Sequence, residues 1–499
     1  MLRIFNYVVY VIFPVFFACG CSYTKDLAVL NKKQAIADID YLVKNLEAVH
    51  PEPYHSIGKE AFSTHVQQIK ANLGNKISRK EFAPLIAETL ALIGDDHTRC
   101  NLFYNYNFFI RDKIKLLPLA LNYKNNHVIV EGWAKTVEPV RLQYGDIVLS
   151  INGKPVTEWL KRYYKYVSAE TMEQKNWQIP YFLPAYIWMT DGIVEQFEIT
   201  GKNVQGQTYQ ESLSAAVPEF SVPPRNAGWG EFPYQFYYED RVCHYKIPSF
   251  DDSLRDNYFK MVDTLLVQLK GKKTTVLIVD LRQNGGGNGE LGQDLLQRVV
   301  SKPLQTGCKK WRYSRTYERN WIIAALKQKN IPPWLLLDRW LRVHWFYGKY
   351  HHLYVDMSKL EGEWINYCIE KGSLTYPKDD PWNGMLVLIV DHGTASAAVD
   401  TTAIVKDNGL GLIVGEETGG RASFYSEICP VYLPNSGIGC VISSAHFIRP
   451  AGYDDGHGVL PDVPMDVTLE DDVLVQEIYH LIDQHFPCGY NGQSERKLE

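Results

Sequence analysis

Ser396 is the residue of this chain best placed to act as a nucleophile, because it lies where a predicted strand meets a predicted helix. The continuous apolar run at residues 385–390 indicates a buried strand, and residues 397–405 are expected to form a helix. The small neighbours of Ser396 leave its hydroxyl uncovered, and the backbone N–H of Ala397 could stabilise an oxyanion from the helix N-terminus. A turn of small residues that only lets a helix pack closely on a sheet would have the same composition, so other segments must decide between the two interpretations.

A glycine-rich loop follows a second predicted buried strand. The strand spans residues 274–282, the loop QNGGGNG occupies residues 283–289, and residues 290–300 are expected to form a helix. Adjacent glycines permit backbone geometry that other residues avoid. The backbone N–H groups of Gly286 and Gly287 are therefore candidate oxyanion donors. A phosphate-binding loop is disfavoured, because no Lys-Ser or Lys-Thr pair follows the glycines.

A series of motifs resembles the C-terminal processing (tail-specific) serine proteases, in the order in which that family has them. Residues 280–287 resemble the family's DLRxNxGG signature, and residues 394–398 resemble its TASAxE nucleophile segment. Residues 414–420 resemble VGxxTxG, residues 92–98 resemble the LxDGHT motif of a branch related to the tricorn core protease, and residues 458–462 resemble GxxPD. The resemblance implies a serine peptidase with an α/β core of the crotonase-like ββα type, without a metal or another cofactor.

The general base is the point at which the chain departs from that family. In the processing proteases a lysine after the serine acts as the base, but residue 421 here is an arginine, which does not give up its proton under these conditions. In the tricorn-like branch a histidine far upstream activates the serine, and His97 matches that position. Histidine is the usual supplier of a general base near neutral pH. His457 is a competing base, and a turn histidine without a catalytic role is the alternative for His97.

The resemblance also implies an acidic residue downstream of the serine. Asp455 is the candidate, with Asp96 as a second supporting carboxylate, although either could be a solvated turn residue. Arg421 is expected to point toward the cleft and to bind a substrate carboxylate through paired hydrogen bonds. The alternative for Arg421 is a structural ion pair with Glu416 or Glu417.

The start of the chain resembles a bacterial lipoprotein signal. Residues 8–18 are almost continuously apolar but too short to span a membrane comfortably, and small residues and cysteines follow. Cys21, or else Cys19, is the expected lipid acceptor after cleavage. An ordinary secretory signal or a signal anchor is the alternative. We therefore expect a lipid-anchored protein of the cell envelope, on the periplasmic face or the outer surface of a bacterial membrane.

Composition fits a globular body behind such an anchor. The 499 residues are enough for two or three domains, and the net charge of -5 argues against nucleic-acid binding. The cysteines show no CxxC spacing of a metal site. Cys429 and Cys440 flank a hairpin-like turn at residues 434–437, where a disulfide is conceivable but not indicated.

The fold class expected is α/β and multi-domain. Helical apolar spacing occurs at residues 33–49, 59–73 and 79–93, and Ser78 with Glu81 resembles a capping box. From about residue 116 to 217 strand-like runs dominate, and residues 142–156 look like the GDxIxxINGxxV segment of a PDZ domain, although an ordinary hairpin at Asn152-Gly153 is the alternative. The expected units are a signal peptide (1–21), an N-terminal helical unit (25–100), a PDZ-like domain (113–217), a serine protease core (234–486) with an insertion at about 308–380, and a loose tail (487–499).

The function predicted from these residues is a serine peptidase that cleaves peptides or unfolded protein ends through an acyl-enzyme. Its partners would be a peptide or unfolded-protein substrate and, through the lipid, a membrane. The main alternative is a non-catalytic peptide-binding protein that keeps the fold, and the arginine at position 421 is its best support. A binder of apolar small molecules on a related fold rests on analogy alone.

Overall fold

The computed structural model describes residues 29–101, 107–124, 126–221, 232–317, 362–366 and 374–485. The predicted signal peptide, with Cys19 and Cys21, lies outside the described residues. The same holds for the predicted tail and for most of the predicted insertion at 308–380. None of the described helices is both long and apolar enough to cross a bilayer.

The N-terminal unit is built from helices whose apolar faces pack together. They are α3 (Lys32–Val49), α4 (Lys59–Asn72) and α5 (Arg79–Ala91), and the short strands β1 (Val29–Asn31) and β2 (Lys76–Ser78) pair beside them. The capping box predicted at Ser78 and Glu81 is confirmed at the start of α5. All three predicted helices are confirmed, with ends that differ by one or two residues. These ends matter because the turn after α5 carries His97.

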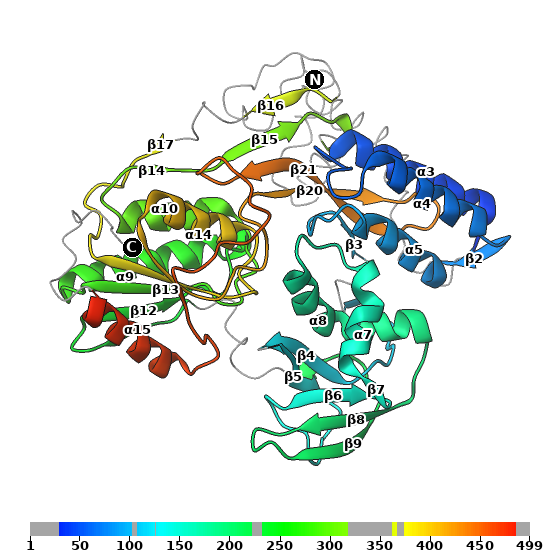
Figure 1. Cartoon of the computed structure of the whole chain (residues 1–499), viewed down its shortest axis with the longest axis horizontal. Helices are drawn as coiled ribbons and strands as arrows, with labels where there is room; N and C mark the ends of the chain where they lie inside the picture. The colour runs from blue at the N-terminus through cyan, green and yellow to red at the C-terminus, as the bar shows by residue number, and fades with distance from the viewer. Residues whose placement is uncertain are drawn as a thin grey trace, which may run out of the picture.

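The next unit is a seven-stranded sheet covered by two helices (Figure 1). Its strands are β4 (Leu119–Lys124), β5 (His127–Ala134), β6 (Ile147–Ile151), β7 (Lys154–Pro155), β8 (Gln196–Lys202), β9 (Thr208–Ser214) and β10 (Phe220–Ser221). Asn152 and Gly153 have positive φ and turn β6 into β7, as a two-residue hairpin requires. Helix α7 (Val156–Tyr163) was not singled out from the sequence, nor was α8 (Met172–Asp191), whose Pro180 and Pro184 disguise its helical pattern.

The core is a six-stranded sheet with helices on both faces (Figure 1). Its order is β11 (Tyr234–Tyr237), β12 (Val242–Lys246), β13 (Val276–Asp280), β18 (Met385–Val390), β19 (Gly411–Gly415) and β22 (Val463–Pro464). All strands except β11 run parallel. Helices α9 (Arg255–Gly271), α10 (Gly289–Val299) and α14 (Ala397–Asn408) cover one face, and α15 (Asp471–His485) covers the other. The loops that carry the glycines and Ser396 leave adjacent parallel strands at the same edge.

A smaller sheet joins the core to the N-terminal helices. It contains β16 (Trp364–Asn366), β15 (Cys308–Arg312), β21 (Gly439–Ile448) and β20 (Phe424–Tyr432), and β3 (Arg99–Cys100) pairs with β21. Two further short strands, β14 (Leu304–Gln305) and β17 (Leu374–Thr375), pair with each other. In Figure 1 the orange strands β20 and β21 reach from the core toward the blue helices. This sheet therefore brings the turn after α5 to the edge of the core.

The disulfide that was conceivable between Cys429 and Cys440 is not formed. Cys440 lies opposite Cys100 on β3, whereas Cys429 lies opposite Ile442. Neither Cys429 nor Cys440 is joined in a disulfide, but Cys308 is disulfide-bonded.

Candidate active site

Ser396 occupies a strained position between β18 and α14. Its backbone has φ 53° and ψ -121°, a positive φ that side-chain-bearing residues rarely adopt. Ser396 is the N-cap residue of α14, so the backbone N–H of Ala397 is the first N–H group of the helix. Backbone strain of this kind persists only where the surroundings hold it, and it is common at functional sites.

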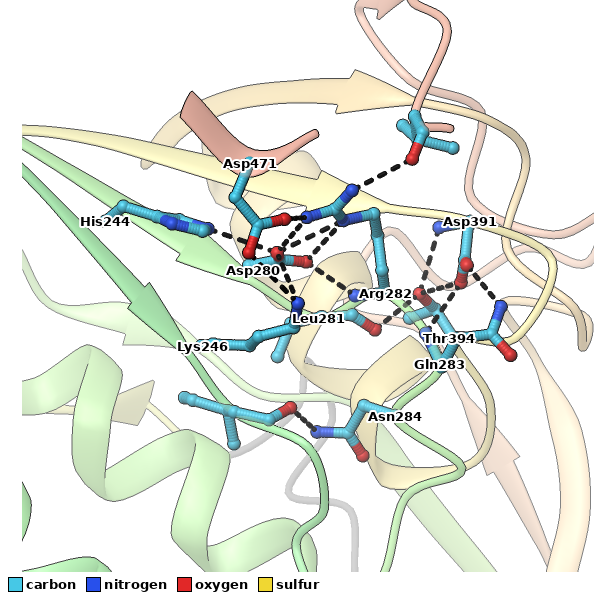
Figure 2. A network of polar contacts seen from close by, with 12 residues as sticks. His244, Lys246, Asp280, Leu281, Arg282, Gln283, Asn284, Asp391, Thr394 and Asp471 are labelled. Atoms are coloured by element: carbon cyan, nitrogen blue, oxygen red, sulfur yellow. Dashed lines mark hydrogen bonds and ion pairs between the residues drawn. The ribbon is translucent and has the colours of Figure 1, made fainter. Parts of the chain in front are cut away.

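The loop before Ser396 is held by the end of the neighbouring strand. The hydroxyl of Thr394 donates to the carbonyl of Leu281 at 2.9 Å, and the N–H of Ala395 donates to the carbonyl of Asn284 at 2.9 Å. The backbone N–H of Gln283 donates to Asp391 at 2.9 Å. Figure 2 shows Gln283, Asp391 and Thr394 lying together beside Leu281, joined by dashed lines. The serine loop and the glycine-rich loop therefore form one rigid unit.

A second buried network anchors the same strand end on its other side (Figure 2). Asp280 accepts from His244 at 3.1 Å and from Arg282 Nε at 2.9 Å, and Arg282 also donates to Asp471 of α15. Burial would raise the pKa of Asp280, but the charge of Arg282 and the hydrogen bond from His244 hold it far below its usual range. We regard this network as structural, because it ties β13 to α15.

Gly286 lies directly against the serine. A Cβ at this position would meet Ser396 Cβ at 2.6 Å and the carbonyl oxygen of Ala395 at 2.7 Å, and its φ of +94° also favours glycine. Its N–H donates to the side-chain oxygen of Asn284 at 2.9 Å, so this predicted oxyanion donor is already engaged. Gly287 lies in the same loop, where a Cβ would meet the carbonyl oxygen of Phe250. Of the predicted donors, Gly287 and Ala397 are left as candidates.

His97 reaches the serine from the N-terminal unit. Its Nε2 lies 3.2 Å from Ser396 Oγ, although the two residues are 299 positions apart in the sequence. The imidazole also stacks against Phe424 of β20, with ring centroids 6.0 Å apart. The sequence paired these two residues as base and nucleophile, and the fold brings their side chains together.

Asp95, which the sequence analysis did not single out, is the carboxylate beside His97. It is fully buried; its Oδ1 accepts from the backbone N–H of His97 at 2.9 Å and lies 3.9 Å from His97 Nδ1. Its Oδ2 accepts from Ser443 Oγ at 2.6 Å and lies 3.2 Å from His50 Nε2. Burial would raise the pKa of Asp95, but the hydrogen bond from His50, the charge of His97 and the Ser443 hydroxyl lower it to about 2. Asp95 therefore stays ionised.

The predicted acidic residues have other partners. Asp96 accepts from Gln178 of α8 at 2.6 Å and pairs with Arg99 at 3.5 Å. Asp455 lies 3.4 Å from Arg449, which is bound mainly to Asp407. Within the described part of the chain, neither carboxylate forms a hydrogen bond or an ion pair with His97. Asp95 matches the aspartate of the LxDGHT motif, which was the signal that could have identified it.

His457 and Arg421 each lie near an acidic side chain. The His457 side chain is 65% exposed and lies 3.7 Å from Glu417. Arg421 Nη1 lies 3.7 Å from Asp454, so its ion-pair partner is neither Glu416 nor Glu417. The backbone N–H of Arg421 donates to Glu170 at 2.7 Å. Burial and the charge of Asp95 raise the pKa of Glu170 well above its usual range.

Comparison with known proteins agrees with this architecture. Residues 241–465 match the model described as Peptidase family S41, and residues 125–179 match the one described as Bacteroidetes, Peptidase, S41 family, N-terminal domain. A chloroplastic C-terminal processing peptidase of Tetradesmus obliquus is 38% identical over 82 residues, a match that spans 16% of this chain and 17% of that protein. The match to the Bacteroidetes N-terminal domain fits a bacterial protein of the cell envelope.

Solved structures share the fold over nearly the whole chain. The structure of mature CPAF complexed with lactacystin has a TM-score of 0.63 at 16% identity, and the match covers 91% of this chain and 99% of that one. Mature CPAF crystallised by itself gives a TM-score of 0.63 at 15% identity over 91% of this chain and 98% of that one. At such identity the likeness concerns the fold alone.

The family match marks residues 241–465 as a core of the peptidase type, on a fold that the CPAF structures share. Residues 241–465 therefore belong to the peptidase family S41 type, and residues 125–179 to the N-terminal domain type of the same family. Within the described residues, no group of three or more histidine, cysteine or acidic side chains is arranged to hold a metal ion.

Proposed function

We propose that the protein hydrolyses peptides or unfolded protein ends with Ser396 as nucleophile and His97 as general base. The observation that carries the proposal is the 3.2 Å between His97 Nε2 and Ser396 Oγ, at a serine with a strained positive φ. A general base has to lie within hydrogen-bond reach of the proton that it removes, and His97 does.

Each step then follows from these atoms. Ser396 Oγ attacks the scissile carbonyl carbon while its proton moves to His97 Nε2. The carbon–nitrogen bond breaks, the departing amine takes that proton, and the acyl group stays on Ser396. Water repeats the sequence: its proton goes to His97, its oxygen attacks the acyl carbon, and Ser396 Oγ leaves and regains the proton.

The oxyanion of each tetrahedral intermediate needs donors that face the serine. We propose the N–H groups of Gly287 and Ala397 for this role, since the N–H of Gly286 already donates to Asn284. Gly286 instead lets the loop approach Ser396 closely, where a side chain would collide.

We assign the acidic role to Asp95 in place of Asp455 and Asp96. For His97 Nε2 to accept the serine proton, its resting proton must be on Nδ1, and Asp95 Oδ1 lies 3.9 Å from that atom. The ionised carboxylate favours the imidazolium that forms in the first step.

Activity against an unfolded protein tests the proposal. Casein cleavage by the wild type, Ser396→Ala and His97→Ala is measured at matched concentrations, and circular dichroism checks that each variant is folded. Loss of the nucleophile is expected to lower turnover on the order of 10³-fold or more. Equal cleavage by the wild type and a folded Ser396→Ala variant would refute the assignment.

We further propose that the mature chain is anchored by lipid at Cys21, or else Cys19, and faces away from the cytoplasm. The apolar run followed by Ala18-Cys19-Gly20-Cys21 supports this, and so does the disulfide at Cys308, because disulfides persist in oxidising compartments. Cells fed a radioactive fatty acid should label the wild type. Undiminished label after both cysteines are changed to serine would contradict the anchor.

A further inference from the structure

His50 lies at the far end of a buried polar chain that begins at Ser396. It caps the C-terminus of α3, where its N–H donates to the carbonyl of Leu46, and its side chain is fully buried. Its Nε2 is 3.2 Å from Asp95 Oδ2, and Asp95 in turn contacts His97. A buried histidine this close to a candidate catalytic residue needs a reason to be there.

The tautomer of His50 follows from its second contact. The backbone N–H of Glu52 donates to His50 Nδ1 at 3.0 Å, and a nitrogen that accepts a hydrogen bond carries no proton. The ring proton is therefore on Nε2, which donates to Asp95. The backbone after α3 thus sets the direction of this hydrogen bond.

Several hydrogen bonds hold Asp95 in place, and Asp95 in turn contacts His97. Oδ2 receives His50 and Ser443 of β21, while the carbonyl oxygen of Asp95 receives Ser168 Oγ at 2.6 Å. This leaves Oδ1 for His97, through its backbone N–H at 2.9 Å. The Nδ1 of His97 is buried and has no hydrogen-bond partner among the described residues, so Asp95 Oδ1 is the carboxylate poised to receive it.

We propose that His50 is a positioning residue that fixes the Asp95 carboxylate and, through it, the orientation of His97 toward Ser396. This rests on the function proposed above and makes the N-terminal helical unit part of the catalytic machinery. Because buried polar chains are worth most when every member is satisfied, loss of the His50 donor should leave Asp95 free to turn.

The other groups that contact His50 do not donate a hydrogen bond to Asp95. The rings of His55 and Tyr425 lie against its faces, with centroids 5.9 Å and 4.8 Å away. Arg312 of β15 donates to the carbonyl of His50 at 3.3 Å, and Tyr425 donates to Glu52 at 2.8 Å. A phenylalanine at position 50 would therefore keep the ring packing and lose only the polar contacts.

The test compares His50→Phe with His50→Gln in the full chain. Gln can place an amide donor near the position of Nε2, so it should restore much of what Phe removes. For Phe we expect kcat to fall about 10- to 100-fold with KM within about twofold, since a small misplacement of a catalytic group costs that much. A folded Phe variant with wild-type kcat overturns the proposal, and so does an equal loss in Phe and Gln.

A double-mutant cycle with Asp95→Asn separates positioning from a general loss of packing. If His50 acts through Asp95, His50→Phe should lower kcat little further once Asp95 is changed, whereas additive losses would mean a separate structural role and would overturn the proposal. Should the Phe variant fail to fold, Gln and Asn at position 50 decide. Asn is too short to reach Asp95, so equal kcat values for the two would contradict the proposal.

A matched control is His244→Phe. His244 is another buried histidine 3.1 Å from a buried aspartate, Asp280, in the structural network of Figure 2. It should lower thermal stability and leave kcat within about twofold. If Ser396→Ala were active, the proposed function itself would fail. If Ser396→Ala is inactive while His50→Phe keeps full kcat, only the role of His50 fails.

Discussion

At the scale of single residues, the site depends on how closely two loops approach. Ser396 has a positive φ, and Gly286 fills the space beside its Cβ. The strain at Ser396 costs about 1–3 kcal/mol and is held by the hydrogen bonds between the two loops. The surrounding loops therefore hold Ser396 in a conformation that serine alone does not prefer.

Gly286→Ala tests that closeness. A Cβ at Gly286 would lie 2.8 Å from the Ala397 nitrogen and 2.6 Å from Ser396 Cβ, so we expect a loss of about 1–3 kcal/mol from strain alone and near-complete loss of activity. The neighbouring Gly285→Ala is the control, because a Cβ there meets nothing within 4 Å. Urea unfolding and casein cleavage measure both effects; equal behaviour of the two variants would contradict the packing described.

The geometry of Arg421 suits two roles, which are binding a substrate carboxylate and forming a structural ion pair. It lies 3.7 Å from Asp454 and is partly exposed, which suits either a structural pair or a carboxylate site. If it binds a substrate carboxylate, Arg421→Met should lower kcat/KM more for a peptide with a free C-terminus than for its C-terminal amide. A uniform loss with lower thermal stability would make it structural, and Asp454→Asn should then lower stability similarly.

At the scale of elements, α14 carries a titrating group one turn after the nucleophile. Asp400 N–H donates to the carbonyl of Ser396 at 3.0 Å, and burial raises the pKa of the Asp400 carboxyl to about 6, although Gln293 lowers it by a hydrogen bond. The folded state is thus less stable when Asp400 is ionised.

Asp400→Asn should show this as a pH-dependent gain in stability. The folded pKa of about 6 lies above the ordinary 3.8, so the folded state holds the proton more tightly and stability falls as pH rises between these values. Near pH 3.5 the Asn variant should be no more stable than the wild type. Its free energy of unfolding relative to the wild type should rise as the pH increases to about 6, and the difference should persist at higher pH. A difference in unfolding free energy that does not vary with pH would rule out this titration.

At the scale of the whole molecule, the proposed mechanism requires the N-terminal unit to stay docked on the core. Asp38 of α3 is fully buried and accepts from the backbone N–H of Asn435 at 2.9 Å and that of Ser436 at 2.8 Å, both in the turn between β20 and β21. The Asn435 side chain donates to it as well, at 2.8 Å. Since the same unit carries His97, this contact helps to hold His97 near Ser396.

Asp38→Ala should therefore weaken stability and activity together. Leaving these donors unpaired is expected to cost about 2–4 kcal/mol, and cleavage should be lost at a lower temperature than in the wild type. Asp40→Ala on the same helix is the control, because the Asp40 side chain is 59% exposed and its pair with Lys70 should matter by less than about 0.5 kcal/mol. Full activity of Asp38→Ala up to the wild-type unfolding temperature would contradict the docking role.

Local patterns in the sequence predicted much of this fold. The apolar runs predicted β13 and β18, and the capping box predicted the start of α5, because these signals are short-range. Helix α8 was missed, since Pro180 and Pro184 interrupt the helical pattern while tertiary packing tolerates them. The partners of His97 were harder to predict: Asp95 meets Ser443 beside the pairing of β3 with β21, and His50 reaches Asp95 from the end of α3, which no local pattern encodes.

An acyl-enzyme trapped on the protein tests the central claim most directly. The wild type is mixed with an acylated peptide ester, quenched in acid within the first turnover, digested and analysed by mass spectrometry. We predict one acyl adduct, on the peptide that contains Ser396, absent from Ser396→Ala and formed more slowly by His97→Ala. An adduct on another residue, or one that persists in Ser396→Ala, would contradict the account.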